Sequence, residues 1–108
     1  MTKATKRVQR TKAISYDVAE HLRTPDEMAA YLDAWLEEAP DDPSGIARAL
    51  GDVARAKGMS QVAKDAGLSR ESLYRALSAE GNPSFATVLK VAKALGVRFH
   101  AQATSSGV

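Results

Sequence analysis

Residues 59–78 (MSQVAKDAGLSRESLYRALS) constrain the fold most strongly, because their pattern predicts two short helices joined by a tight turn. The predicted helices cover residues 59–66 and about 70–78. Helices that cross steeply need a small residue where they approach and a turn residue that tolerates positive φ, and Ala63 and Gly67 meet these two needs. The apolar residues expected to fill the space beneath the crossing are Val62, Ala66, Leu68, Leu73 and Leu77.

Start and stop signals predict three further helices around this pair. The motif Thr24-Pro25-Asp26-Glu27 is a capping box with proline at the first helical position, and this helix should end where residues 40–43 (PDDP) break it. A second helix is expected at about residues 44–57. A last helix should begin after Ser84, a natural N-cap, and stop at Gly96.

Apolar residues at helical spacing predict which faces of these helices are buried. On the helix that follows Thr24 they are Met28, Tyr31, Leu32, Trp35 and Leu36. On the last helix they are Phe85, Val88, Leu89, Ala92 and Leu95. Beyond Gly96 apolar and polar residues alternate over residues 97–102, which predicts one short strand. The chain is therefore expected to be an all-α protein of five helices with a short C-terminal strand.

Length and composition narrow the class of protein. A chain of 108 residues with 44% hydrophobic content suits one domain with a core. No apolar run is long enough to cross a bilayer, and residues 1–12 lack the apolar stretch of a secretory signal. The absence of cysteine excludes disulfides and thiolate metal sites. We therefore expect a cytoplasmic protein with no membrane partner.

Charge is separated along the chain. Residues 1–15 carry five basic residues and no acidic one, residues 16–43 carry nine acidic residues and one basic one, and residues 44–108 carry nine basic and four acidic residues. The three blocks therefore carry +5, −8 and +5. This pattern indicates two kinds of partner, phosphate for the basic blocks and a positively charged surface for the acidic block. The alternative is that solvated faces simply carry charge.

The helix predicted after Gly67 carries polar residues on its outward face. Arginine pairs well with guanine in the major groove, so either arginine of this helix is a candidate base reader; the alternative is an ordinary solvated side chain. Glu71 either accepts a hydrogen bond from cytosine or, as we favour, orients Arg75. Ser60 and Gln61 are candidate phosphate ligands, with helix capping as the alternative. Tyr74 either belongs to the domain surface or contacts phosphate. The full candidate set is Ser60, Gln61, Ser69, Arg70, Glu71, Tyr74 and Arg75.

These residues carry a family resemblance. The spacing of Ala63, Gly67 and Leu73 resembles the helix-turn-helix of phage repressors and their relatives. Residues 47–97 as a whole resemble the probable addiction-module antidote proteins, which are HigA-like antitoxins, and the segments GLSRESLYRALS and GNPSFATVLKVAKALG are the most specific part. The segment YDVAEHL at residues 16–22 is also similar, so the resemblance covers about residues 16–99.

The resemblance implies a lambda-repressor-like helix-turn-helix fold and a type II toxin–antitoxin role. Such an antitoxin binds a toxin of the RelE/ParE superfamily and represses its own operon by binding operator DNA. Operators of such proteins are usually inverted repeats, which favours a homodimer. The edge of the strand predicted at residues 97–102 is the candidate dimer contact.

The predicted organisation assigns one partner to each part of the chain. The divisions are a disordered basic tail at 1–13, an acidic helical extension at 14–42, a helix-turn-helix domain at 43–102 and a flexible tail at 103–108. The candidate toxin-binding residues are Tyr31, Asp33, Trp35, Glu37 and Glu38. Two alternatives remain: the aromatic stripe belongs to the core, or the toxin docks on the helix at residues 85–95.

Other classes of function find less support. A stand-alone prophage-type repressor without a toxin shares the same fold and DNA site, and a pure interaction module with a vestigial helix-turn-helix is a further alternative. His21 and His100 are isolated, so no metal site is expected. No Ser–His–Asp arrangement or phosphate-binding loop is visible, so neither enzymatic activity nor a cofactor is expected.

Overall fold

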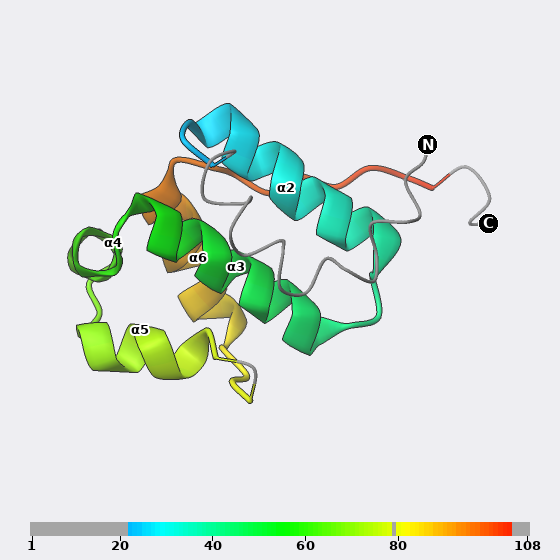
Figure 1. Ribbon diagram of the computed structural model, residues 1–108. Coiled ribbons are helices and arrows are strands. Elements are labelled where there is room, and N and C mark those ends of the chain that lie inside the picture. The colour runs from blue at the N-terminus through cyan, green and yellow to red at the C-terminus, as the bar shows by residue number, and fades with distance from the viewer. Residues whose placement is uncertain (1–21, 79, 105–108) are drawn as a thin grey trace.

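Five α-helices make up the regular structure of the part of the chain that the computed structural model describes, residues 22–78 and 80–104. They are α2 (Pro25–Glu38), α3 (Pro43–Lys57), α4 (Met59–Ala66), α5 (Arg70–Ala76) and α6 (Phe85–Leu95), as Figure 1 shows. The expected all-helical architecture is confirmed for these residues. The predicted basic tail, residues 14–21 of the acidic extension and residues 105–108 lie outside the described residues.

Side-chain caps set the starts of α2, α5 and α6 where the sequence predicts them. At the start of α2 the Glu27 N–H donates to Thr24 Oγ1 at 3.2 Å, and Glu27 Oε1 accepts from the Thr24 N–H at 3.1 Å. This is the predicted capping box. Ser69 and Ser84 cap α5 and α6 in the expected manner, each accepting from the backbone N–H three residues later. Asp42, which the sequence analysis did not single out, caps α3.

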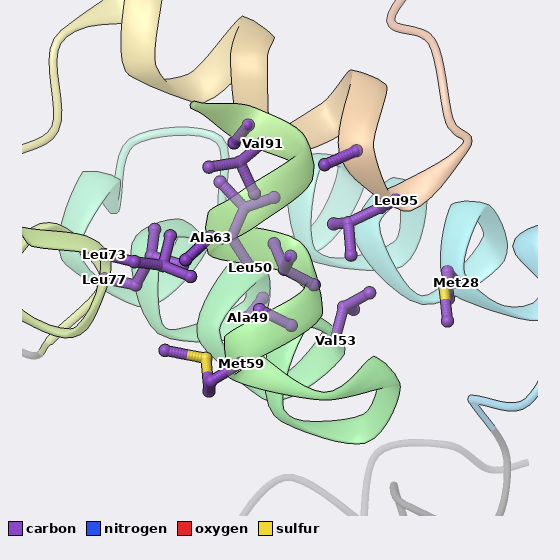
Figure 2. Packing of buried hydrophobic residues seen from close by; sticks show 14 of the residues in the cluster. Met28, Ala49, Leu50, Val53, Met59, Ala63, Leu73, Leu77, Val91 and Leu95 are labelled. Atoms are coloured by element: carbon purple, nitrogen blue, oxygen red, sulfur yellow. The ribbon is translucent and has the colours of Figure 1, made fainter. Parts of the chain in front are cut away.

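One hydrophobic core joins all five helices. Its centre is formed by Leu50 and Val53 of α3, which are almost completely buried against side chains of α4, α5 and α6 (Figure 2). Met28 and Leu32 of α2, each 4% exposed, belong to the same cluster. The α2 helix packs along α3 and therefore shares one core with the helices that follow it in the chain.

The buried face of α6 differs from the prediction. Ala92 and Leu95 are buried as expected, but Phe85 is 70% exposed and Leu89 is 46% exposed. Val91 occupies the core instead, together with Ala94. The stripe of Phe85 and Leu89 and the stripe of Val91 and Leu95 both repeat at helical spacing. Contact with α4 and α3 buries the stripe of Val91 and Leu95. On α2, Leu36 also differs from the prediction, with 39% of its surface exposed.

The short C-terminal strand is not confirmed. Residues 97–104 form neither helix nor strand, and Figure 1 shows them running beside α2. A strand needs a partner for its backbone groups, and the described residues supply no second strand. None of the described helices combines the length and apolar character needed to cross a membrane.

Candidate nucleic-acid interface

A left-handed turn joins α4 to α5. Gly67 has φ of 73° and ψ of 30°, which is the positive φ that its position predicts. The Gly67 N–H donates to the Lys64 carbonyl at 3.1 Å, and the Leu68 N–H donates to the Ala63 carbonyl at 2.8 Å. An added Cβ at Gly67 would meet no atom within 4 Å, so the backbone conformation alone selects glycine here. The turn closes α4 and redirects the chain into α5.

The inner side of α5 is fixed by two leucines. Leu73 is completely buried and Leu77, at the C-cap, is 2% exposed. Both belong to the core, as predicted, and Figure 2 shows them together beside Ala63 of α4. At the start of the helix, Ser69 accepts from the Ser72 N–H at 3.0 Å. Packing below and capping at one end therefore leave the other face of α5 exposed.

The outer side of α5 carries two side-chain pairs, each spaced by four residues. The Arg70 guanidinium lies 5.4 Å from the centroid of the Tyr74 ring, and its Nη2 is 3.4 Å from the Tyr74 hydroxyl. Arg75 Nη2 lies 3.9 Å from Glu71 Oε2, with side chains that are 72% and 84% exposed respectively. Exposed pairs of this kind are worth at most about 1 kcal/mol. Tyr74 and Glu71 therefore orient the two arginines, but these contacts are weak enough to be replaced by contacts with a binding partner.

The two candidates on α4 are also exposed, and neither caps the helix. The N-cap of α4 is Gly58, and no side chain caps that end. The capping alternative therefore does not apply to Ser60, whose side chain is exposed. The Gln61 amide donates to Asp65 Oδ1 at 2.9 Å, within α4. All seven predicted residues are therefore exposed, on α4, on α5 or at the N-cap of α5.

The aromatic residues of α2 point into the protein. The Tyr31 hydroxyl donates to Asp52 Oδ2 of α3 at 2.8 Å. Burial, and secondarily the Asp52 charge, raise the pKa of Tyr31 to about 12, although a side-chain hydrogen bond from Trp35 opposes this shift. Trp35 lies on the start of α3, where a Cβ on Gly45 would come within 2.6 Å of Trp35 Cζ3. The interpretation of this stripe as packed on the core is confirmed.

The acidic candidates of α2 lie on its other side. Asp33, Glu37 and Glu38 are all exposed, and the structure gives none of them an ion pair with a described residue. The structure therefore separates the predicted toxin-binding residues into two half-buried aromatic residues and three exposed carboxylates. Among the residues that the structure describes, no cluster of three or more histidine or carboxylate side chains could hold a metal ion.

Sequence reasoning missed Asp52. It holds Tyr31 through one carboxylate oxygen, and its other oxygen accepts from Arg55 Nη2 at 3.0 Å. The Asp52–Arg55 pair is visible as a helical i,i+3 spacing, but the contact to Tyr31 spans 21 residues and depends on how α2 lies on α3. No local pattern in the sequence announces such a contact.

The chain is similar to one protein family and to a protein of Haemophilus influenzae. Residues 12–103 match the model of the family described as "Probable addiction module antidote protein". A protein of Haemophilus influenzae, described as an uncharacterized protein, is 56% identical over 87 residues, which cover 81% of this chain and 88% of that protein. No solved structure matches the chain.

Proposed function

Since the chain belongs to the family of probable addiction module antidote proteins, we propose that it is the antitoxin of a type II toxin–antitoxin module. In this role it binds and neutralises a toxin of the RelE/ParE superfamily in the cytoplasm. It also represses its own operon as a homodimer on operator DNA. The observation that carries the proposal is the family match over residues 12–103, which includes every candidate contact residue.

The DNA-binding element in this proposal is a lambda-repressor-like helix-turn-helix made of α4, the turn at Gly67 and α5. Arg70 and Arg75 read base edges in the major groove, where a bidentate arginine–guanine pair contributes about 1–3 kcal/mol of discrimination. Their exposure and their weak intrahelical partners support this role, because leaving those partners costs little. Glu71 orients Arg75, and Ser69 lies at the N-cap of the reading helix.

The remaining candidates fix the protein on the DNA backbone. Ser60 and Gln61 contact phosphate from α4, and Tyr74 contacts it from α5. The exposure of all three side chains supports this assignment, since Tyr74 keeps 42% of its surface exposed and both α4 residues are classed as exposed. Contacts of this kind set the register of the protein on DNA and carry no sequence information directly.

The toxin-binding element in this proposal is the exposed side of α2. Asp33, Glu37 and Glu38 attract a basic partner, and charges of this kind act mainly on the association rate. Tyr31 and Trp35 pack against the core and α3, and this packing fixes the orientation of α2. These five residues act together, with the aromatic side chains positioning the helix and the carboxylates meeting the toxin.

The structure also offers a second candidate surface for the toxin. Phe85 and Leu89 lie one turn apart on α6 and are 70% and 46% exposed. Exposed large apolar side chains at neighbouring positions are typical of interaction sites. Replacement of Phe85 by serine would abolish toxin binding if α6 is the neutralising surface, and would leave it unchanged if α2 is.

The proposal is tested with the full-length chain, the DNA upstream of its gene and the product of the adjacent reading frame. We expect the chain to bind the upstream duplex more tightly than a scrambled duplex of equal length. We also expect co-expression to restore growth of cells that express the neighbouring product. Absence of both effects would contradict the proposed function, whereas DNA binding without growth rescue would indicate a repressor without a toxin partner.

A further inference from the structure

The C-terminal segment has the side-chain pattern of a strand without the pairing of one. Val97 and Phe99 are half-buried, while Arg98 and His100 between them are exposed. This alternation has the period of two that an extended chain in a sheet shows. Figure 1 shows the segment beside α2, and residues of both elements line one groove.

The backbone of this segment makes few hydrogen bonds within the part of the chain that the structure describes. The Val97 N–H donates to the Ala92 carbonyl at 3.0 Å, as part of the cap of α6. No backbone hydrogen bond joins residues 98–104 to another described residue. Successive N–H groups of an extended chain point to opposite edges, so those of Arg98 and His100 point away from the edge that Val97 uses. That edge is a template for pairing with another strand.

We propose that residues 97–101 pair with the same residues of a second copy of the chain, as a two-stranded antiparallel ribbon whose two-fold axis passes beside Phe99. This inference rests on the homodimer in the proposed function and specifies its contact. The backbone N–H and C=O groups of Arg98 in one copy pair with those of His100 in the other copy, and those of His100 pair with those of Arg98. The two Phe99 residues form the non-hydrogen-bonded pair between them.

The charges and the side-chain pattern of residues 97–101 favour this register, and they favour a second copy of the chain as the partner. A two-fold axis at Arg98 would place two arginines directly opposite one another, which is unfavourable, whereas an axis at Phe99 places Arg98 opposite His100. The same axis places Val97 opposite Ala101, so the apolar residues of both copies share one face. A two-fold contact must be self-complementary, and a segment of alternating apolar and polar residues meets that requirement.

The groove beside the segment adds a charge argument for a second copy. Its α2 wall consists of Ala29, Ala30 and Leu32 together with Asp33 and Leu36. Asp33 is exposed at the rim of this groove, and Arg98 and His100 line the opposite side. A second copy brings another Arg98 toward the acidic α2, so the charges of the two copies are complementary across the ribbon.

Proline substitutions test which N–H groups pair. Proline removes the N–H and accepts extended backbone, so His100→Pro should remove two of the four hydrogen bonds of the ribbon. Ala101→Pro is the matched control, because the N–H of residue 101 points to the other edge. Sedimentation velocity without DNA should show the dimer Kd raised about 10–100-fold by His100→Pro and little changed by Ala101→Pro. Equal effects of the two substitutions, or a wild-type chain that remains monomeric at high micromolar concentration, would overturn the proposal.

A cysteine scan tests the register independently. The chain has no cysteine, so a single introduced thiol can form a disulfide only with the same thiol of a second copy. Phe99→Cys should form a disulfide-linked dimer readily, because non-hydrogen-bonded pairs bring Cβ atoms within about 4.5–5.5 Å of each other. Ala101→Cys should do so slowly, since it lies opposite Val97. Faster crosslinking at position 101 would overturn the register. A His100→Pro chain that remains dimeric and still binds DNA and toxin would reject the ribbon and leave the proposed function standing.

Discussion

The helices α2 and α5 rest on one core but expose opposite chemistry. On α2 the aromatic residues turn inward, where Tyr31 bonds to Asp52 of α3, and carboxylates remain outside. On α5 only Leu73 turns fully inward, and Arg70 and Arg75 remain outside. The difference shows how two helices on one core can expose side chains of opposite charge. A core substitution should therefore affect both surfaces, and a surface substitution only one.

The largest effect is expected in the core that the two surfaces share. Leu73→Ala removes a side chain that is completely buried. Truncation of a buried leucine costs about 2–5 kcal/mol, because it loses apolar burial and leaves a cavity. Urea unfolding followed by circular dichroism measures this loss. Leu36→Ala, at a site that is 39% exposed, is the matched control and should cost much less. Equal costs for the two variants would contradict the assigned core.

A smaller and more selective effect is expected on α5. Arg70→Ala or Arg75→Ala should weaken binding to the upstream DNA by about 1–3 kcal/mol, because each removes a candidate base contact. Fluorescence anisotropy measures the affinity, and thermal unfolding checks that the fold is intact. Arg48→Ala removes one exposed positive charge from α3 and serves as the control for net charge. A loss of DNA affinity as large in Arg48→Ala would show that α5 has no special role.

How far the sequence predicts the fold depends on whether the signal is local. Caps and breakers are local, so the starts of α2, α5 and α6 and both ends of α4 agree with the prediction. The helix predicted to reach about residue 78 ends at Ala76, which is within the usual uncertainty of a helix end. The inward leucines of α5 also agree, because the tight turn at Gly67 fixes which face meets α4.

Signals that depend on tertiary packing are less well predicted. Periodicity along α6 does not distinguish the stripe of Phe85 and Leu89 from that of Val91 and Leu95, and contact with α3 and α4 decides between them. The Tyr31–Asp52 hydrogen bond depends on the placement of α2. Residues 97–102, predicted as a strand, do not form one in the described chain. Alternating apolar and polar residues favour an extended backbone, but a strand also needs a partner strand, and the described residues contain none.

A further prediction concerns the contact that fixes α2 on α3. Tyr31→Phe removes the hydroxyl that donates to Asp52 at 2.8 Å and should cost about 1 kcal/mol of stability. The raised pKa of Tyr31, about 12 in the folded protein, means that the folded state holds this proton more tightly than the unfolded state. Its stabilising contribution is complete below about pH 10, the ordinary pKa of tyrosine, and is lost as the pH rises toward 12. Wild-type stability should therefore fall more steeply than that of Tyr31→Phe between pH 10 and 12, and parallel curves would contradict this account.

The smallest effect is expected at Glu71. Its ion pair with Arg75 is 3.9 Å long and exposed, so Glu71→Gln should change stability by less than about 0.5 kcal/mol. Its role in DNA binding should appear as a modest change in sequence preference, because glutamine no longer orients Arg75 by charge. Competition titration with single-base variants of the upstream DNA measures this preference. A stability loss above about 1 kcal/mol would show that the pair matters for folding more than its exposure suggests.

The most direct test of two separate surfaces compares two multiple variants in two binding assays. One variant is Arg70→Ala with Arg75→Ala, and the other is Glu37→Gln with Glu38→Gln. Binding to the upstream DNA and to the product of the adjacent reading frame is measured for both, with folding checked by circular dichroism. The account predicts that the α5 variant loses DNA affinity and keeps toxin affinity, while the α2 variant shows the reverse. Loss of both activities in a folded variant, or unchanged DNA binding in the α5 variant, would contradict it.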